Sequence, residues 1–437
     1  MLLFLFLASY RTKRNSFTGL LFADDLLILG RTNDEIYEKL KLVQDWCTLN
    51  KMEINFGKTK ILDKEKDRLW PVWNEDSQNT DDIEAKLSFS YLGVPVSFKG
   101  QISWTYGPHF DQIISRAKKY KSAIYKIAVN SIDRGETIKV CWENVALPSI
   151  LFGCETTVFT LQSLKTLEKI QCEIAKLCLG VRCDTSGLGS RVEAGMMSIK
   201  SRIMIRQLNY MNSVLLRPNS IVYHALIENT NGQWSSPLRK LWSDIKSKSH
   251  TYGEFNQTRV KKSVMAVENV EIERQMETSN SLLFMTSKAI KKRGPYIKRS
   301  ETQDILKAFR VGDWRLGIKE LKIPNLPTMC PMGCQKTFDL PHFMLWCPQL
   351  DTTRKETGII DFFINYKSKS YDDEDIVRRY LWASDDDPTE VKKHGQAIIR
   401  MRNNWYKAAI SKKINLNVRT KLKMDNKLIL KIFIRVE

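Results

Sequence analysis

The sequence predicts an α+β fold, with a small sheet near the N-terminus and helices over most of the remaining chain. Three observations lead to this prediction. Short apolar runs flank an acidic pair in LLFADDLLIL, apolar residues recur at helical spacing from about residue 104 to residue 224, and cysteines gather with a histidine between residues 330 and 347. The 437 residues are enough for two or three domains.

Residues 20–62 predict a hairpin, then a helix, then a strand. The apolar runs LLF and LLIL are typical of a buried hairpin. The segment TNDE matches a capping box, in which Thr32 faces Glu35 at the start of a helix. The apolar face of this helix consists of Ile36, Leu40, Val43 and Cys47. The segment MEINFGKTKIL then predicts a strand.

The following elements are predicted from local signals. The segment NEDSQNTDD is polar enough to predict a loop, and FSYLGVPVS predicts a strand in which Gly93 and Pro95 mark a turn or an edge position. A long helix in the next region ends at Gly180. Residues 229–299 predict a linker with loosely amphipathic helices. A final helix should begin at Pro388. Its apolar stripe consists of Val391, Ile398, Trp405 and Ala408.

The charge balance favours a polyanionic partner. The chain carries 69 Lys and Arg against 49 Asp and Glu, which is a formal net charge of +20. An excess of this size is typical of nucleic-acid binding, and a membrane surface is the weaker alternative. Residues 391–437 alone hold thirteen basic residues and two acidic ones, so eleven of the twenty excess charges lie there.

The opening segment MLLFLFLASY does not predict a membrane span. Its apolar run is too short, no basic segment precedes it, and no convincing cleavage site follows. Nine cysteines are spread along the chain without a dense disulfide pattern. We therefore expect a soluble intracellular protein without a membrane partner.

Asp24 and Asp25 form the most unusual pair in the chain. A bare Asp-Asp pair in a turn is commonly a solvated turn. Here the turn contains no glycine, and apolar runs on both sides should partly desolvate the two carboxylates. Adjacent carboxylates in such a place repel each other unless a divalent cation compensates them. The pattern predicts a metal site.

Several motifs in order resemble reverse transcriptases. The segment FADD between apolar runs is similar to the catalytic hairpin of their palm, and NFGKT is similar to the next palm motif. YLGVPVS, from Tyr91 to Ser97, resembles the hairpin that grips the primer end. ALPSILFGCE and LEKIQ resemble the thumb and connector of non-LTR retrotransposon polymerases.

The resemblance implies an organisation and a set of roles. Residues 1–100 would be a partial palm, 101–228 a helical thumb and connector, 229–325 a basic linker with helices, and 351–437 a helical region with a basic tail. The activity would be RNA-directed DNA synthesis with Mg²⁺, an RNA template and a DNA primer or target. In that family one carboxylate of the hairpin binds metal, which implies this role for Asp24 and a supporting one for Asp25.

Two further sets of residues take roles from the resemblance. Lys58 would assist the departing pyrophosphate, and the alternative is an ordinary exposed lysine. The primer grip would consist of Tyr91, Leu92 and Gly93.

One departure from the family affects the expected activity. A second catalytic carboxylate belongs on a palm strand well upstream, but only 23 residues precede Asp24 and none is acidic. We interpret MLLFLFL as the end of the helix that leads to the hairpin, so the hairpin should lack a strand partner. We expect this chain alone not to polymerise. The alternative function is non-catalytic RNA or DNA binding through the cysteine cluster and the basic tail.

Cys330, Cys334, His342 and Cys347 form the second candidate site. Three, seven and four residues separate them in turn, and four such ligands predict a closed tetrahedral zinc site. The alternative is a chance group of buried thiols. Residues 326–350 also resemble the CCHC motif that follows the polymerase domain in non-LTR elements. Phe343 and Trp346 lie between the last two ligands, where we expect them to pack in a core rather than stack on bases.

Basic residues in two clusters are the predicted nucleic-acid contacts. They are Lys291, Lys292, Arg293, Lys392, Lys393, Arg400, Arg402, Lys412 and Lys413. Trp405, Tyr406 and Phe433 are interleaved with the second cluster and are expected to lie along a phosphate backbone with it. The lifestyle of non-LTR elements and the segment KKRGPYIKR favour a nuclear location, otherwise a cytoplasmic one.

Overall fold

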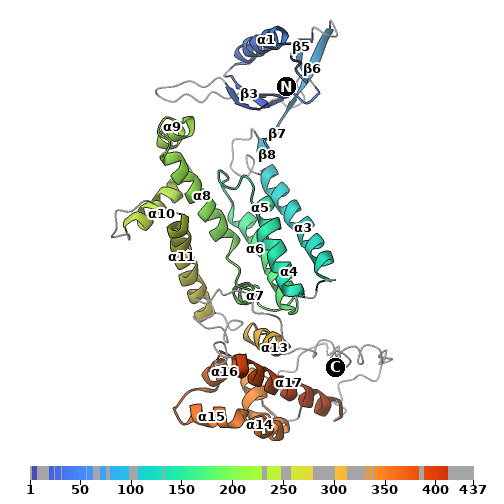
Figure 1. Cartoon of the computed structure of the whole chain (residues 1–437), viewed down its shortest axis with the longest axis vertical. Helices are drawn as coiled ribbons and strands as arrows, with labels where there is room; N and C mark the ends of the chain where they lie inside the picture. The colour runs from blue at the N-terminus through green and yellow to red at the C-terminus, as the bar shows by residue number, and fades with distance from the viewer. Residues whose placement is uncertain are drawn as a thin grey trace. The chain divides into compact units, whose positions relative to one another are not determined.

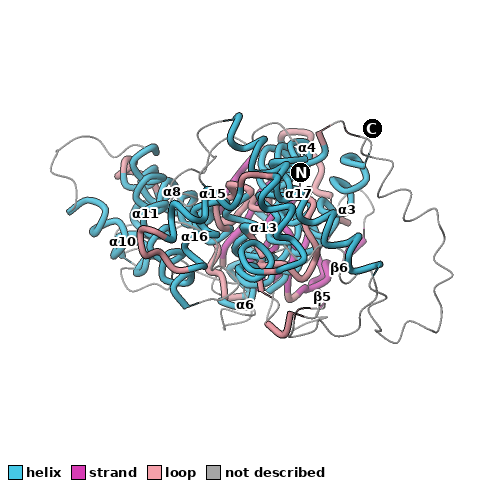
Figure 2. The backbone as a smooth tube through the Cα atoms, turned by 90° about the horizontal axis from the view of Figure 1, so that it is seen from below, coloured by secondary structure: helices cyan, strands magenta, loops and turns pink. Residues whose placement is uncertain are grey.

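The computed structural model describes most of the chain in segments. These are residues 2–6, 19–23, 25–30, 32–55, 57–62, 69–74, 79–97, 107–129, 131, 133–228, 234–247, 257–278, 301–312, 330, 332, 334–336, 339–382 and 388–411. Helices predominate over strands in this part of the chain (Figure 2), which agrees with the predicted α+β class. No helix within these segments has the length and apolar character needed to cross a bilayer.

The chain divides into two compact units. The N-terminal unit consists of Met1–Ser131, Thr137–Ile174 and Met197–Val270. The C-terminal unit consists of Ile132–Glu136, Ala175–Met196 and Glu271–Glu437. The candidate hairpin site belongs to the first unit and the cysteine cluster to the second, so the two are described separately.

A six-stranded sheet opens the N-terminal unit, in the order β2-β3-β1-β4-β6-β5 among the described residues. Its strands are β1 (Leu2–Phe6), β2 (Gly19–Phe22), β3 (Asp25–Leu29), β4 (Lys60–Leu62), β5 (Leu69–Asn74) and β6 (Asn79–Lys86). Helix α1 (Asn33–Leu49) packs against this sheet (Figure 1). The core between them contains Ile28, Ile36, Leu40, Ile61, Ile83 and Ala85.

The predicted hairpin and helix are confirmed, whereas the strand predicted over MEINFGKTKIL is limited to its last three residues, Lys60–Leu62. Strands β2 and β3 pair antiparallel, with Phe22 opposite Asp25. Thr32 is the N-cap of α1, and its hydroxyl accepts a hydrogen bond from the Glu35 N–H at 3.2 Å. The predicted apolar face of α1 is buried or packed against the core, and the chain returns to the sheet as β4.

Residues 2–6 correct one prediction, because they form a strand and not the end of a helix. Strand β1 lies between β3 and β4 and is parallel to both, with Leu2 opposite Asp25 and Phe6 opposite Leu62. The expectation that the hairpin lacks a strand partner is therefore also wrong. A short continuous apolar run has no periodicity that separates strand from helix, and the free edge of β3 selects the strand.

The polar segment after β4 corrects a second prediction. Strands β5 and β6 pair antiparallel from Leu69 opposite Glu84 to Asn74 opposite Asn79, so Asn79–Asp82 belong to a strand rather than a loop. Propensity against strands in NTDD is weak in comparison with the backbone hydrogen bonds of a ladder.

The segment FSYLGVPVS forms a hairpin of two strands. Strands β7 (Ser88–Tyr91) and β8 (Val94–Ser97) pair antiparallel, and Tyr91 lies opposite Val94. Leu92 and Gly93 connect them with φ of 48° and 80°. A two-residue turn with positive φ at both positions matches the twist of a hairpin, so the predicted turn at Gly93 is confirmed.

The helical prediction for residues 104–224 is confirmed. The helices are α3 (Gly107–Val129), α4 (Arg134–Val140), η1 (Cys141–Ala146), α5 (Leu147–Ile150), α6 (Leu161–Leu179), α7 (Gly187–Glu193), α8 (Ile199–Leu215) and α9 (Ile221–Glu228). Two more, α10 (Ser235–Ser247) and α11 (Gln257–Thr278), lie in the segment for which a linker with helices is predicted. Helix α6 ends at Gly180, which takes φ 69°. Helices α10 and α11 pack with α8 and α9 around a core that includes Leu208, Leu226, Leu238 and Val264.

The segment LEKIQ joins several helices of the N-terminal unit. The buried Gln171 donates from Nε2 to the Met197 carbonyl at 2.9 Å and accepts from the Trp142 indole at 3.3 Å. Glu168 accepts a hydrogen bond from the Ile199 N–H at 2.8 Å, at the first turn of α8. A carboxylate stabilises a helix N-terminus by satisfying its free N–H groups and its dipole. This motif therefore has a structural role here.

Seven helical elements form the described part of the C-terminal unit beyond α11. They are α13 (Glu301–Arg310), η3 (His342–Trp346), η4 (Pro348–Leu350), α14 (Asp351–Glu356), α15 (Ile359–Lys367), α16 (Asp373–Trp382) and α17 (Pro388–Ser411). Helix α17 begins at Pro388 as predicted, and its buried stripe contains Ile398 and Trp405.

Trp405 corrects a prediction, because it is buried and cannot lie along a phosphate backbone. Its ring centroid is 6.5 Å from that of Phe343 in an edge-on contact. The periodicity that placed Trp405 on the apolar stripe with Ile398 was the stronger signal, since burial of an indole stabilises more than its exposure to solvent. Tyr406 and Phe433 have side chains outside the described residues.

Candidate metal centre

The first two cysteines of the cluster lie on a short loop. The Cys330 N–H donates to the Lys336 carbonyl at 2.7 Å, which closes the loop around Cys334. Gln335 takes φ 54°, and this left-handed residue turns the chain back after Cys334. The side chain of Met332 is buried beneath the loop. The loop thus directs both thiols to one side.

His342 and Cys347 are brought together by an unusual helical turn. Residues five apart in an α-helix point about 140° apart, because each residue advances about 100°. Residues 342–346 instead form a π-helix, and the Cys347 N–H donates to the His342 carbonyl at 2.8 Å. A bond between residues five apart places one above the other, so the imidazole and the thiol share a face. The spacing of four residues between these ligands requires this turn.

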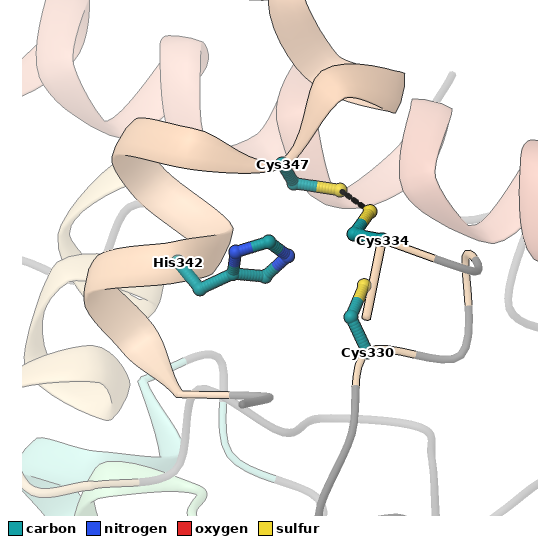
Figure 3. Close-up of side chains that lie close together, drawn as sticks. All are labelled: Cys330, Cys334, His342 and Cys347. Carbon is teal, nitrogen blue, oxygen red and sulfur yellow. Dashed lines mark hydrogen bonds between the residues drawn. The ribbon is translucent and has the colours of Figure 1, made fainter. Parts of the chain in front are cut away.

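The four side chains converge on a common point (Figure 3). Their ligand atoms all lie within 4.8 Å of one another, and the Sγ atoms of Cys334 and Cys347 are 3.8 Å apart. Two thiolates held about 2.3 Å from a tetrahedral zinc ion are roughly 3.8 Å apart. A disulfide needs about 2.05 Å, and all nine cysteines are free. The cluster could hold a metal ion such as zinc.

Burial marks this as a closed site. Cys330, His342 and Cys347 are 4%, 5% and 0% exposed, and only Cys334 reaches the surface in part. The buried Nε2 atom of His342 has no hydrogen-bond partner among the described residues. A buried ring nitrogen without a partner is costly unless it has a ligand, and a metal ion would satisfy it.

The Cys330 and Cys347 thiols are joined by a hydrogen bond that shifts their pKa values in opposite directions. A hydrogen bond with Cys347, assisted by the Met332 N–H, lowers the pKa of the Cys330 thiol to about 5. The same pairing, together with burial, raises the pKa of Cys347. A metal ion replaces the proton of this hydrogen bond and converts the remaining thiols to thiolates.

Arg354 stabilises the backbone of the site through hydrogen bonds, and no sequence pattern indicated this role. Its buried guanidinium donates to the Cys347 carbonyl at 2.6 Å and to the Phe343 carbonyl at 3.5 Å, and it pairs with Asp351. These bonds fix the end of the π-turn that carries both ligands. Its only sequence signal was an arginine seven residues after the last cysteine.

The two aromatic residues between the ligands behave differently. Phe343 is buried, and its ring centroid lies 6.1 Å from that of Phe309, which confirms the predicted core position. Trp346 is 53% exposed, so the prediction that it packs in a core is wrong. The π-turn rotates Trp346 outward while it turns Phe343 inward, and the sequence alone does not show this turn.

The predicted hairpin site is only partly described. Asp24 lies outside the described residues, and Asp25 begins β3 with its buried Oδ1 lacking a hydrogen-bond partner among those residues. Ala23 precedes the pair with φ 51°, a strained value for alanine. Burial and the charge of Asp25 raise the pKa of Tyr91, so this residue of the predicted primer grip lies near Asp25. Asp25 belongs to no metal-binding group of three side chains among the described residues.

The other predicted residues of this site have ordinary environments. Lys58 is exposed in a turn, where its backbone N–H donates to Asn55 Oδ1 at 3.1 Å. Thr59 is buried and donates to the Asn55 carbonyl at 2.8 Å. The segment NFGKT thus forms a self-supported turn before β4. Leu92 is exposed at the tip of the β7–β8 hairpin.

The predicted basic contacts lie partly on α17. Lys392, Lys393 and Arg400 are exposed, opposite the buried stripe, and Arg402 is half-buried. Lys393 lies 3.7 Å from the Glu390 carboxylate. Lys291, Lys292, Arg293, Lys412 and Lys413 lie outside the described residues.

Comparisons of the sequence with models of protein families and with curated proteins find no match.

Proposed function

We propose that the C-terminal unit is a zinc-stabilised nucleic-acid-binding module, and that the chain derives from a non-LTR retrotransposon reverse transcriptase. The observation that carries the first part is the convergence of three thiols and one imidazole within 4.8 Å. Three sulfur ligands and one nitrogen favour zinc over the hard cations, which prefer oxygen.

The zinc ion is structural in this proposal. Four protein ligands complete a tetrahedron and leave no position for water or substrate. The ion would join the loop of Cys330 and Cys334 to the π-turn of His342 and Cys347. When bound, it supplies a cross-link between these two segments. The ion itself then makes no contact with nucleic acid, and other side chains of the unit must do so.

The exposed face of α17 supplies the cationic surface. Lys392 and Arg400 lie two turns apart on one side of the helix, while Ile398 and Trp405 anchor the other side in the core. A row of cations on a rigid helix favours contact with a phosphate backbone. The net charge of +20 is in accord with this partner.

We expect a double substitution on α17 to weaken nucleic-acid binding in a salt-dependent way. Replacing Lys392 and Arg400 with glutamine should reduce the slope of log affinity against log salt by roughly 2, about one for each lost phosphate contact. The measurement is fluorescence anisotropy of a labelled RNA titrated with the full chain at several salt concentrations. Lys261→Gln with Lys262→Gln, both exposed on α11, removes equal charge as a control. An equal loss in both variants would contradict a surface on α17.

The reverse-transcriptase part of the proposal is supported by the order of motifs and by the hairpin. A strained turn residue, Ala23, adjoins two carboxylates, and Asp25 has a buried oxygen without a partner among the described residues. Only this part of the proposal involves Mg²⁺, an RNA template and a DNA primer. Nuclear residence would follow from it.

Substitution of Asp24 distinguishes the reverse-transcriptase part of the proposal from the nucleic-acid-binding part. If hairpin chemistry operates, Asp24→Ala should abolish Mg²⁺-dependent primer extension while leaving RNA affinity within about twofold, because a lost metal ligand acts on the chemical step. Primer extension with an RNA template and filter binding measure the two effects. A chain that extends primers equally well with and without Asp24 would refute the assigned role. Asn50→Ala, in the same unit, is the matched control.

A further inference from the structure

Trp346 is an exposed indole held in a fixed orientation. It lies between the ligands His342 and Cys347 and exposes 53% of its surface. Its Nε1–H donates to Asp373 Oδ2 at 2.7 Å, which joins the π-turn to the first turn of α16. A ring already held by a hydrogen bond loses little further entropy when a partner stacks on it.

A cavity of about 620 Å³ lies beside this ring. Its lining is mixed, because Pro341, Pro348 and Trp346 offer apolar surface while Lys336, Asp339 and Asp373 offer polar groups. Two side chains of the metal-binding cluster, Cys334 and His342, complete the lining. An apolar groove for a hydrophobic helix would lack these polar groups. A mixed lining with a flat aromatic wall suits a planar ring that carries hydrogen-bonding edges.

Cations lie near the ring. The Lys367 ammonium is 5.8 Å from the centroid of the Trp346 ring and 3.0 Å from Asp373 Oδ1. Lys336 is exposed at the cavity lining. A base stacked on the indole would carry its phosphates toward such groups, since each phosphate lies at the edge of its nucleotide.

We propose that Trp346 and this cavity bind an unpaired base of a single-stranded RNA or DNA by stacking. The proposal rests on the nucleic-acid-binding function above and adds a preference for single strands to it. In a duplex each base is already stacked on its neighbours, so only an unpaired base can place its face against the indole. The zinc-ordered π-turn presents the ring, and Asp373 orients it.

The test compares two variants of the full chain on two ligands. The ligands are a short labelled single-stranded RNA and an abasic strand with the same number of phosphates. Trp346→Ala should weaken binding to the RNA about tenfold and leave binding to the abasic strand unchanged, because stacking on one base is lost. The control is Trp46→Ala on α1, which removes a tryptophan of similar exposure, 50%, and should change neither affinity. Trp346→Phe, which keeps a ring, should retain most of the affinity.

The outcomes separate this inference from the function on which it rests. A wild-type chain that binds neither strand refutes nucleic-acid binding altogether. Equal affinity of wild type and Trp346→Ala for the RNA, or an equal loss on both strands, overturns base stacking while the electrostatic surface stands. Unchanged zinc content in Trp346→Ala shows that its centre is intact. Photocrosslinking with a halogenated uridine provides a second readout, and crosslinked peptides without Trp346 would also overturn the proposal.

Discussion

Replacing Cys347 with serine is expected to abolish metal binding and to unfold the C-terminal unit. Cys347 is fully buried, and its carbonyl also accepts from Arg354. Structural zinc contributes about 10–16 kcal/mol of apparent binding free energy in small zinc modules at neutral pH. A whole domain has a net stability of only about 5–15 kcal/mol. Loss of the ion therefore removes a free energy about as large as the whole net stability of a folded domain.

The measurement combines zinc content by mass spectrometry with chemical unfolding of the full chain. Wild type should carry one zinc ion per chain, and a chelator should reproduce the effect of the substitution. Cys183→Ser is the matched control, because Cys183 is an exposed cysteine of the same unit outside the cluster. A Cys347→Ser chain with full zinc content and unaltered unfolding would show that the four side chains are only packed thiols.

Replacing Arg310 with methionine is expected to destabilise the C-terminal unit by about 3–5 kcal/mol, since the substitution breaks a buried ion pair with Glu193. The Arg310–Glu193 ion pair spans 3.3 Å, and each side chain is only 6% exposed. The guanidinium also donates to the Leu381 carbonyl at 2.6 and 2.9 Å. It lies 4.0 Å from the centroid of the Trp382 ring. One side chain thus joins α7, α13 and α16.

The free energy of unfolding in denaturant measures this effect. Combining Arg310→Met with Glu193→Leu should recover much of the loss, because an apolar pair can replace a buried ion pair at little cost. Arg274→Met is the surface control: its pair with Glu271 is largely exposed and should leave the unfolding midpoint unchanged. If the single Arg310 variant unfolded like wild type, the buried network would not hold these helices together.

Local signals in the sequence predicted much of the fold. The cap at Thr32, the glycine stop at Gly180 and the start of α17 at Pro388 depend only on neighbouring residues. The apolar face of α1 follows from helical periodicity in the same way. Each of these signals acts over one or two turns, so the chain around it is sufficient to specify the outcome.

Other elements depend on partners distant in sequence. Leu2–Phe6 is a strand because β3 and β4 offer it two edges, and Asn79–Asp82 is a strand because β5 pairs with it. Neither segment has a periodicity that selects this structure. Only the assembled sheet satisfies their backbone groups, and this is why the sequence predictions for both were wrong.

The candidate metal ligands were recognisable from the sequence without a fold, because three cysteines and a histidine occur at suitable spacing. The sequence by itself also determined the basic character that favours nucleic acid. The tertiary structure alone decided which aromatic residues pack and which are available: Trp405 enters the core, while the π-turn exposes Trp346 beside a cavity. Ligand identity is a property of side-chain chemistry, whereas exposure depends on the backbone turn and on every element packed around it.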